Sequence, residues 1–262
     1  MIEALNLSKR YGNTTVVDAL SLCIPRGGLY SIIGPNGAGK STLLAMLARL
    51  MPADAGEVCF DGIPLTQLEN AALARQLAIL RQDNHLSMRL TVRDLVGFGR
   101  YPHCKGRPGP EDERHVDEAL RYMDMQAFSA RFLDQLSGGQ RQRAFVAMVL
   151  AQDTDYILLD EPLNNLDLRH AAEMMALLRR LVDERGKTVV LVIHDINMAA
   201  AWSDRIVAMK HGRLVRAGTP AEIMQAEVLE EIYGLRMPVS HVAGYPLGLH
   251  WLPEAARAGR GA

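Results

Sequence analysis

The sequence predicts an α/β fold built around a mostly parallel sheet. Apolar runs of strand length recur as LYSII, LAIL, YILL and TVVLVI, at residues 29–33, 77–80, 156–159 and 188–193. None of them alternates with polar residues, which is typical of strands that are buried on both faces of a parallel sheet. Helical periodicity fills much of the sequence between them, at 41–50, 138–151 and 169–184.

The N-terminal third of the chain has a different pattern. Residues 2–8, 15–24 and 57–60 alternate more between apolar and polar side chains, and Asp61-Gly62 is a turn signal. Alternation and tight turns are typical of antiparallel strands. We therefore expect an N-terminal antiparallel β subdomain in addition to the parallel core.

Residues 84–135 have the composition of a mainly helical block. Thr91 and Asp94 can cap one helix, and the acidic residues 111–113 favour the positive end of another. This block, extended to about residue 145, is interpreted as a helical subdomain inserted into the α/β core.

The C-terminal part carries two local signals. His211-Gly212, between IVAM and RLVRAG, predicts a hairpin. Thr219 then precedes Pro220, and Glu222 follows at the third helical position, which is the pattern of a capped helix start. The tail ARAGRGA at 256–262 is expected to be disordered.

Length and composition restrict the possible classes of protein. A chain of 262 residues, 48% hydrophobic and 23% charged, suits one large domain or a domain with an insertion. The formal net charge of −1 argues against a protein that binds nucleic acid by neutralising phosphates. The N-terminus has no apolar stretch of signal-peptide length, and the longest apolar runs are too short to span a bilayer.

The cysteines argue against disulfides and structural zinc. Cys23, Cys59 and Cys104 are odd in number and form no CxxC pair, as expected for reduced thiols in a cytosolic protein. The histidines near Cys104 in sequence have no standard ligand spacing, so surface histidines are the favoured interpretation.

GPNGAGKST at 34–42 is the most specific motif in the chain. It fits G-x-x-x-x-G-K-[ST] between an apolar run and a helical pattern, the context that a phosphate-binding loop requires. Its backbone N–H groups would face a polyphosphate, and the helix start would add its positive end. Lys40 would reach the β- and γ-phosphates, Ser41 would bind Mg²⁺, and Thr42 would add a phosphate contact. The other predicted contact residues are Gly34, Pro35, Asn36, Gly37, Ala38 and Gly39.

Two further apolar runs end in residues with catalytic potential. YILL runs into Asp160-Glu161, and TVVLVI runs into His194. Because ligands bind beyond the carboxyl ends of parallel strands, we expect these residues to converge on the phosphate loop. Asp160 suits a water-mediated Mg²⁺ contact, and Glu161 suits the base or positioner for an attacking water. His194 is placed to contact the γ-phosphate.

A second glycine-rich stretch, LSGGQRQR at 136–143, also begins a helical pattern. A helix start offers backbone N–H donors to an anion, with Ser137, Gly138, Gly139 and Gln140 as the candidate contacts. The chain therefore has a second candidate anion-binding site about a hundred residues after its phosphate loop.

Taken together, these motifs resemble the ATP-binding subunit of an ABC transporter over about residues 1–240. GPNGAGKST matches the Walker A motif, ILLDEP the Walker B motif and LSGGQ the family signature. Gln82, Asp167 and His194 match the Q-loop, D-loop and H-loop, and Tyr11 lies where the family stacks an aromatic ring on adenine. The resemblance implies a P-loop NTPase core, with Gln82 acting in catalysis and in Mg²⁺ binding.

The same resemblance implies that a second copy of the chain is needed. In the family, two subunits pack head to tail with two ATP molecules between them. Ser137, Gly139 and Gln140 of one subunit would then complete the γ-phosphate shell above Lys40 of the other. The second anion-binding site would therefore bind the nucleotide held by the neighbouring chain.

Two stretches resemble those of iron–siderophore importers, NHLSMRLTVRDLVGFGRYPHCKGR at 84–107 and EPLNNLDLRH at 161–170. The second departs from the commoner D-loop at Asn164-Asn165 but keeps Asp167. The resemblance implies an ATPase that drives import of a ferric siderophore through a polytopic permease. A substrate-binding protein would be an indirect partner, and nucleic acid would not be one.

The resemblance places the chain peripherally at the cytoplasmic face of the bacterial inner membrane. Residues 241–262 would form a partly disordered C-terminal extension. Import of heme or cobalamin stays open, as does a non-transport ABC ATPase acting on nucleic acid or ribosomes. The single cassette and the lack of sustained heptads in the helical block weigh against that last class.

Overall fold

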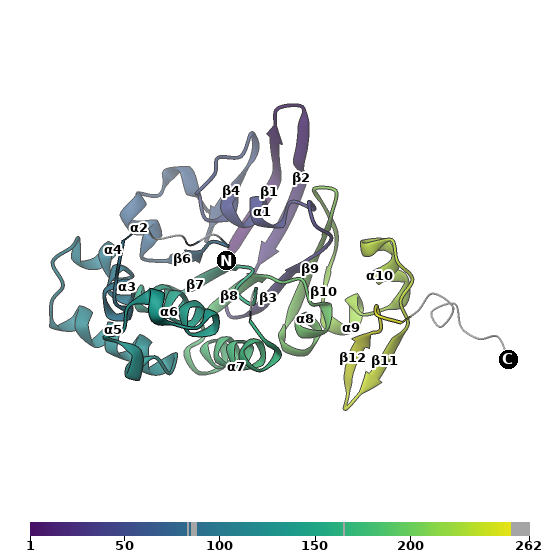
Figure 1. Cartoon of the computed structure of the whole chain (residues 1–262). Coiled ribbons are helices and arrows are strands. Elements are labelled where there is room, and N and C mark those ends of the chain that lie inside the picture. The colour runs from purple at the N-terminus through teal and green to yellow at the C-terminus, as the bar shows by residue number, and fades with distance from the viewer. Residues whose placement is uncertain (83, 85–87, 165, 253–262) are drawn as a thin grey trace. The chain divides into compact units, whose positions relative to one another are not determined.

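The computed structural model describes residues 1–82, 84, 88–164 and 166–252. The chain divides into two units, each described by itself. The first contains Met1–Leu65 and the described residues from Leu191 onward, and the second contains Thr66–Val190 (Figure 1). No helix among the described residues is both long and apolar enough to cross a bilayer.

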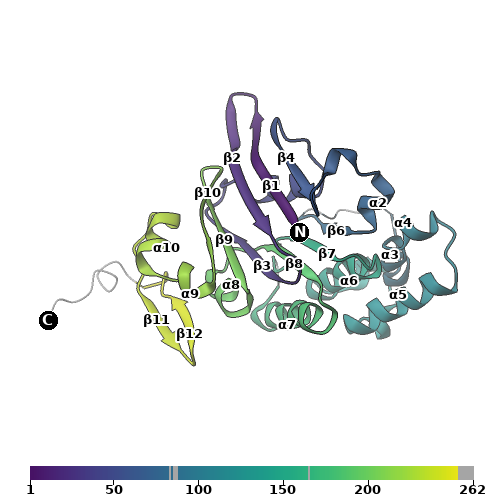
Figure 2. The same cartoon turned by 180° about the vertical axis from the view of Figure 1, so that it is seen from behind.

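A four-stranded antiparallel sheet begins the first unit, as the alternating segments predict. Its strands are β1 (Ile2–Tyr11), β2 (Thr14–Ile24), β4 (Ala55–Phe60) and β5 (Ile63–Pro64), in the order β2-β1-β4-β5. Figure 2 shows β2, β1 and β4 in this sequence. Its inward side chains are fully buried, among them Ile2, Leu7, Leu20 and Ile24. The turn between β4 and β5 is Asp61-Gly62, and both residues have positive φ, at 49° and 79°.

The parallel strand pair of the first unit carries the phosphate-loop motif at one end. β3 (Gly28–Ile33) pairs in parallel with β9 (Arg205–Lys210), and five of its six residues are buried. Helix α1 (Lys40–Leu47) follows the loop after β3. The predicted hairpin joins β9 to β10 (Arg213–Gly218) through His211-Gly212.

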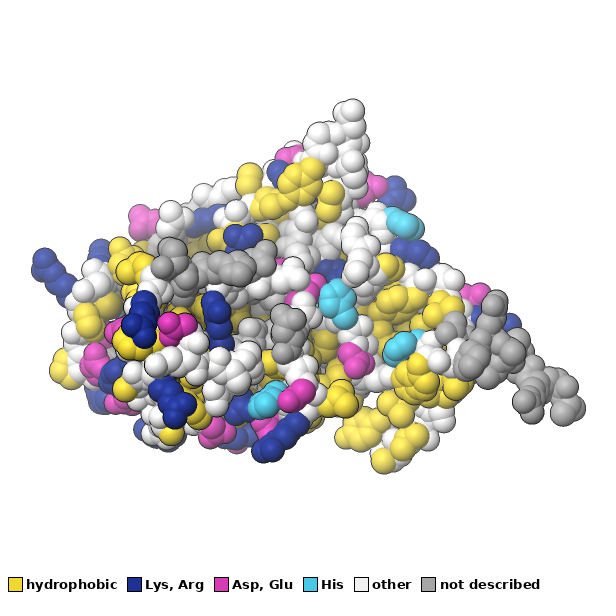
Figure 3. All heavy atoms as spheres, in the orientation of Figure 1, with side chains coloured by type: hydrophobic (Ala, Val, Ile, Leu, Met, Phe, Trp, Pro, Cys, Tyr) yellow, Lys and Arg dark blue, Asp and Glu magenta, His cyan; other side chains and the backbone are white. Residues whose placement is uncertain are grey.

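The rest of the first unit contains elements that the sequence patterns did not predict. They are α8 (Ile196–Trp202), α10 (Ala226–Tyr233), β11 (Val239–Val242) and β12 (Tyr245–Gly248). The predicted helix start at Thr219 is confirmed, but α9 (Pro220–Ile223) is only one turn long. Hydrophobic side chains gather on the surface around the β11–β12 hairpin (Figure 3). Val242 and Tyr245 of this hairpin are exposed. The tail predicted to be disordered lies outside the described residues.

The second unit contains its own parallel pair. β6 (Leu77–Leu80) runs alongside β7 (Tyr156–Asp160), and β8 (Thr188–Val192) leads the chain back to the first unit. The helices α2 (Asn70–Ala74), α6 (Gly138–Ala151) and α7 (Leu168–Arg185) belong to the same unit. The continuous apolar runs therefore form the buried strands that they predict.

The block after β6 is mainly helical, as predicted. It contains α3 (Val92–Phe98), α4 (Tyr101–Cys104) and α5 (Pro110–Tyr122), followed by one-turn 3-10 helices at Gln126–Phe128 and Leu133–Gln135. Thr91 and Asp94 form the predicted capping box on α3. Helices α3 and α5 both pack against α6.

Arg100, at the N-cap of α4, connects this helix to α5 and to α6. Its side chain is 5% exposed, and its Nε donates to Asp112 Oδ1 at 3.0 Å. Its NH1 donates to the backbone oxygen of Ala151, at the end of α6, at 2.8 Å. The N–H of Gly109, and then Arg100, hold the pKa of Asp112 below its usual range. The buried guanidinium thus binds two acceptors, one on α5 and one at the end of α6.

Arg100→Ala should lower the free energy of unfolding by about 3 kcal/mol near pH 7, because the Asp112 carboxylate loses its cationic partner and keeps only the N–H of Gly109, and the end of α6 loses its donor. Because the pKa of Asp112 is lower in the folded chain than its usual value of about 4, the ionised carboxylate stabilises the fold at pH values above about 4. That contribution is lost as the pH falls through the lowered pKa. The deficit should therefore shrink in acid. Urea unfolding of Arg100→Ala beside the exposed control Arg107→Ala measures both effects, and equal stability of the two variants would refute this role.

Candidate functional site

The loop between β3 and α1 has the backbone that its glycines permit. Gly34 and Gly39 have φ of 143° and 93°, in the region that favours glycine. A Cβ on Gly34 would overlap the carbonyl oxygen of Met209, and one on Gly39 would overlap that of Val16. Both glycines are therefore required by close backbone contacts as well as by φ.

Lys40 closes this loop from the first turn of α1. Its Nζ donates to the backbone oxygens of Gly34 and Pro35, each at 2.9 Å, and the residue is 5% exposed. The N-cap of α1 is Gly39, which supplies no side-chain acceptor to the first N–H groups of the helix. Ser41 and Thr42 follow in the same turn. The arrangement presents a cation, a helix start and two hydroxyls to an anion.

His194 lies next to the phosphate loop within the first unit. The N–H of Ile193 donates to the oxygen of Ile32 at 3.2 Å. His194 follows Ile193 directly, and Gly34 lies two residues beyond Ile32. His194 also lines a cavity of about 510 Å³ at the start of α8, together with Tyr233 of α10. The predicted proximity of His194 to the loop is found in this unit.

Tyr233 is a loop contact that no sequence motif indicates. Its hydroxyl accepts a hydrogen bond from the backbone of Gly34, and burial raises the pKa of the phenol. Tyr11, by contrast, lies at the end of β1, is 49% exposed, and its hydroxyl donates to the sulfur of Met51 at 2.9 Å. Stacking of Tyr11 on adenine stays a prediction.

The strand-end residues of the second unit meet because of the register of β6 and β7. Leu80 pairs with Leu159, and Gln82 and Glu161 each lie two residues farther along. Gln82 Nε2 donates to Glu161 Oε2 at 2.7 Å. Asn164 Nδ2 donates to the same oxygen. Two amides from different segments therefore orient one carboxylate.

Asp160 and Glu161 have different environments although they are adjacent. Asp160 is the last residue of β7 and is 8% exposed. Glu161 has φ of 51°, a left-handed conformation that is uncommon for a residue with a side chain. Backbone strain of this kind persists where surrounding contacts hold it, and it is frequent at functional sites. The sequence predicts the pair of acids but gives no sign of the turn that separates them.

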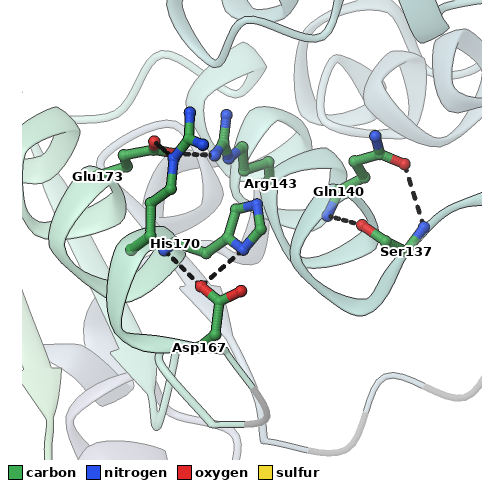
Figure 4. Close-up of polar contacts among 7 residues, drawn as sticks. Ser137, Gln140, Arg143, Asp167, His170 and Glu173 are labelled. Carbon is green, nitrogen blue, oxygen red and sulfur yellow. Dashed lines mark hydrogen bonds and ion pairs between the residues drawn. The ribbon is translucent and has the colours of Figure 1, made fainter.

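The second glycine-rich motif begins helix α6, as predicted (Figure 4). Ser137 is the N-cap, and its hydroxyl accepts from the N–H of Gln140 at 3.3 Å. Gln140 Oε1 accepts in return from the N–H of Ser137 at 3.1 Å. This capping box fixes the first turn through Ser137 and Gln140. The N–H groups of Gly138 and Gly139 in that turn have no intrahelical acceptor.

Asp167 caps α7 beside this turn (Figure 4). Its Oδ1 accepts from both the backbone N–H and the ring Nδ1 of His170, each at 2.8 Å. The backbone bond and then the ring bond lower the pKa of Asp167. One turn farther on, Glu173 accepts from Arg143 of α6 and from Arg169 of α7. Neither His170 nor this ion triad was identified from the sequence.

The predicted residues thus form two local groups. The phosphate loop, Tyr11 and His194 belong to the first unit, and Gln82, Asp160, Glu161, Asp167 and the glycine-rich helix start belong to the second. Convergence of the two groups on one ligand stays a prediction. Among the described residues, no cluster of three or more His, Cys, Asp or Glu side chains could hold a metal ion. Asp160 is the single buried acid in the described part of the chain, and its carboxylate, like the hydroxyl of Ser41, is a hard oxygen donor of the kind that Mg²⁺ prefers.

Comparison with known proteins gives consistent matches over most of the chain. Residues 17–164 match the family described as ABC transporter. The petrobactin import ATP-binding protein YclP of Bacillus subtilis (strain 168) is 51% identical over 251 residues, covering 96% of this chain and 100% of that protein. The ferric enterobactin transport ATP-binding protein FepC of Escherichia coli (strain K12) is 42% identical, with 92% and 90% covered.

A solved structure is similar over most of the chain. It is the dimeric structure of a post-hydrolysis state of the ATP-binding cassette MJ0796 bound to ADP and Pi, with a TM-score of 0.75 and 32% identity. The similarity covers 84% of this chain and 99% of that one. It confirms the predicted fold class, a P-loop NTPase core with a mostly parallel sheet.

Gly139→Ala tests how tightly the glycine-rich turn packs. Alanine usually stabilises a helix interior relative to glycine. Here the added Cβ would lie 3.2 Å from Cγ of His170, so the ring or the helix must shift. We expect Gly139→Ala to be about 1 kcal/mol less stable than Gly138→Ala, its exposed neighbour, in urea unfolding. A Gly139→Ala protein as stable as the Gly138→Ala control would show that His170 does not restrict this position.

Proposed function

The chain belongs to the ABC transporter family, and from that premise we propose that it is the ATPase subunit that drives import of a ferric siderophore through a membrane permease. ATP hydrolysis is the activity of this family's ATP-binding subunits. The relatives named for petrobactin and ferric enterobactin support the substrate class. The observation that carries the mechanism is the Glu161 carboxylate, oriented by Gln82 at the ends of two parallel strands.

ATP would bind first through its phosphates. Lys40 would exchange its two loop carbonyls for phosphate oxygens, and the N–H groups at the start of α1 would bind the same anion. Thr42 would add a hydrogen bond, and Tyr11 would stack on the adenine. We assign Mg²⁺ to Ser41, Gln82 and Asp160. When bound by these residues, Mg²⁺ would neutralise charge on the phosphates of ATP.

Hydrolysis requires a water positioned in line with the γ-phosphate. Glu161 would accept its proton, since the carboxylate is already oriented by amide donors. His194 would contact the γ-phosphate and stabilise its charge in the transition state. Gln82 would leave Glu161 to bind Mg²⁺ and the water when ATP is present, and so would report nucleotide occupancy.

A second copy of the chain would complete each site. Ser137, Gly138, Gly139 and Gln140 would supply the helix start that binds the neighbour's γ-phosphate, and Asp167 would lie at the same interface. The capping box supports this role because it fixes the turn and leaves the glycine N–H groups to an external anion.

The permease would be contacted through the helical block that follows Gln82. A change of partner at Gln82 would displace the start of that block and so transmit ATP binding to the membrane subunits. On this proposal, the protein would lie peripherally at the cytoplasmic face of the bacterial inner membrane. The iron chelate itself would be contacted by the permease and its substrate-binding protein, and nucleic acid takes no part.

Glu161→Gln should lower ATP hydrolysis by about 10²–10⁴-fold while ATP binding is kept, because the amide cannot accept a proton from water. The variant should also accumulate as an ATP-bound dimer in gel filtration. Steady-state phosphate release and nucleotide binding measure the two effects. Glu111→Gln, an exposed change on α5, is the matched control. Turnover near the wild-type rate in Glu161→Gln would exclude it as the base.

The proposed composite site predicts complementation between two inactive subunits. Lys40→Ala damages the phosphate loop, and Ser137→Arg damages the signature turn. In a mixed dimer, one site pairs the intact loop of the Ser137→Arg chain with the intact signature of the Lys40→Ala chain. We expect this mixture to retain ATP tightly, as measured by filter binding.

The control combines wild-type chain with a chain that carries both changes. Each composite site of this mixed dimer contains one lesion, so it should retain less ATP than the complementary mixture. In each mixture the two chains carry different affinity tags, and the mixed dimer is isolated through both tags so that homodimers do not contribute. If the loop and the signature acted within one chain, the control mixture would hold the only intact site, and the order of the two mixtures would be reversed.

A further inference from the structure

We propose that His170 is a positioning residue that fixes the Asp167 turn to the signature turn, so that the two elements facing the neighbour's nucleotide move as one unit. This inference rests on the proposed composite site. It assigns a role to a side chain that no motif of the sequence identifies. His170 lies in the first turn of α7 and its ring points toward the cap residue Asp167 (Figure 4). The same ring lies close to Gly139 of α6.

The first contact is the ring bond to Asp167. Asp167 Oδ1 accepts from the backbone N–H and from ring Nδ1 of the same residue, His170. The backbone bond is sufficient for the helix cap, because any residue at position 170 supplies that N–H. The ring bond therefore adds a constraint on the Asp167 side chain that helix formation does not require.

The second contact is the packing of the ring against Gly139. Cγ and Cδ2 of His170 would lie 3.2 and 3.3 Å from a Cβ at this position, so the buried glycine backbone approaches the ring closely. Gly139 does not have a positive φ, so its backbone conformation does not explain why glycine occupies this position. The close approach of His170 supplies the reason that the capping-box turn contains a glycine here.

A third contact holds the same two helices one turn farther on. Arg143 of α6 and Arg169 of α7 both donate to the carboxylate of Glu173 on α7. The side chain of Arg143 is 16% exposed, so this pair is partly shielded from solvent. The ion triad keeps α6 and α7 adjacent, and His170 then sets the relative position of their N-terminal turns.

Three substitutions at position 170 separate the ring bond from the packing. His170→Asn keeps a donor at the position of Nδ1 and a branched planar group against Gly139. His170→Leu keeps the branched shape and removes the donor. His170→Ala removes both. His241→Leu, on the exposed strand β11, is the matched control for loss of an imidazole.

We expect His170→Leu and His170→Ala to weaken ATP-dependent dimer formation about five- to tenfold, the scale of one hydrogen bond to a charged group at a partly exposed site. His170→Asn should keep at least half of the wild-type dimer formation, and His241→Leu should match the wild type. Gel filtration of the variants in a Glu161→Gln background measures dimer formation. Thermal unfolding without nucleotide should show a loss no larger than that of one hydrogen bond, because the backbone cap remains.

A mixture of two variants tests whether His170 acts on the nucleotide site of the neighbouring chain. His170→Leu chain combined with Lys40→Ala chain contains one composite site with an intact loop, an intact signature and His170. ATP retention should recover to the level of the Lys40→Ala and Ser137→Arg mixture. If the latter mixture fails, the composite site itself is wrong. If it succeeds and the His170→Leu mixture does not, only the role of His170 is wrong.

Two other results would overturn the inference. One is wild-type dimer formation by His170→Leu, and the other is an equal loss in His170→Asn and His170→Leu, which would show that the ring bond is irrelevant. Should His170→Leu fail to fold, His170→Phe takes its place in the comparison with His170→Asn, because phenylalanine keeps a planar ring without a donor.

Discussion

The register of buried parallel strands decides where the chemistry of this protein is placed. Leu80 opposite Leu159 brings Gln82 and Glu161 together two residues later. In the first unit, the bond from Ile193 to Ile32 brings His194 beside the phosphate loop. A slip of the register would separate these side chains. It would also draw the polar residues that follow each apolar run toward the buried part of the sheet, which is unfavourable.

The loops between these strands and the following helices turn this placement into a site. Gly34 permits a close approach to the Met209 carbonyl that a Cβ would block. Lys40 then donates a hydrogen bond from its side chain to the carbonyl of Gly34. Glu161 has a left-handed backbone, with its carboxylate held by Gln82 and Asn164. In both places the backbone adopts an uncommon conformation, and side-chain contacts stabilise it before any ligand arrives.

Much of the fold was predictable because its signals are local. Continuous apolar runs, turn glycines and capping residues each act within a few residues, and the strands, hairpin and capped helices that they predict are found. The phosphate loop and the glycine-rich turn were recognised for the same reason. The β11–β12 hairpin was missed because its turn, Ala243-Gly244, places an alanine at φ of 52°, where no turn rule expects it.

The parts of the site that were missed depend on long-range contacts. Tyr233 reaches Gly34 from a short helix two hundred residues later, and His170 reaches Gly139 from another helix. A single tyrosine or histidine in a helix has no pattern of its own, so only the folded chain identifies these contacts. Asn164 was noted as a departure from the family pattern, but its bond to Glu161 emerges only from the turn geometry.

The most direct test of the composite site is a disulfide between the phosphate loop and the signature turn. A chain with Cys23, Cys59 and Cys104 replaced by serine would carry Asn36→Cys and Ser137→Cys together, and would be oxidised with and without ATP and Mg²⁺. Denaturing electrophoresis without reductant distinguishes bonds between chains from bonds within one chain. The head-to-tail arrangement predicts a covalent dimer that forms only with nucleotide. An oxidised product that stays monomeric, with its disulfide inside a single chain, would contradict it.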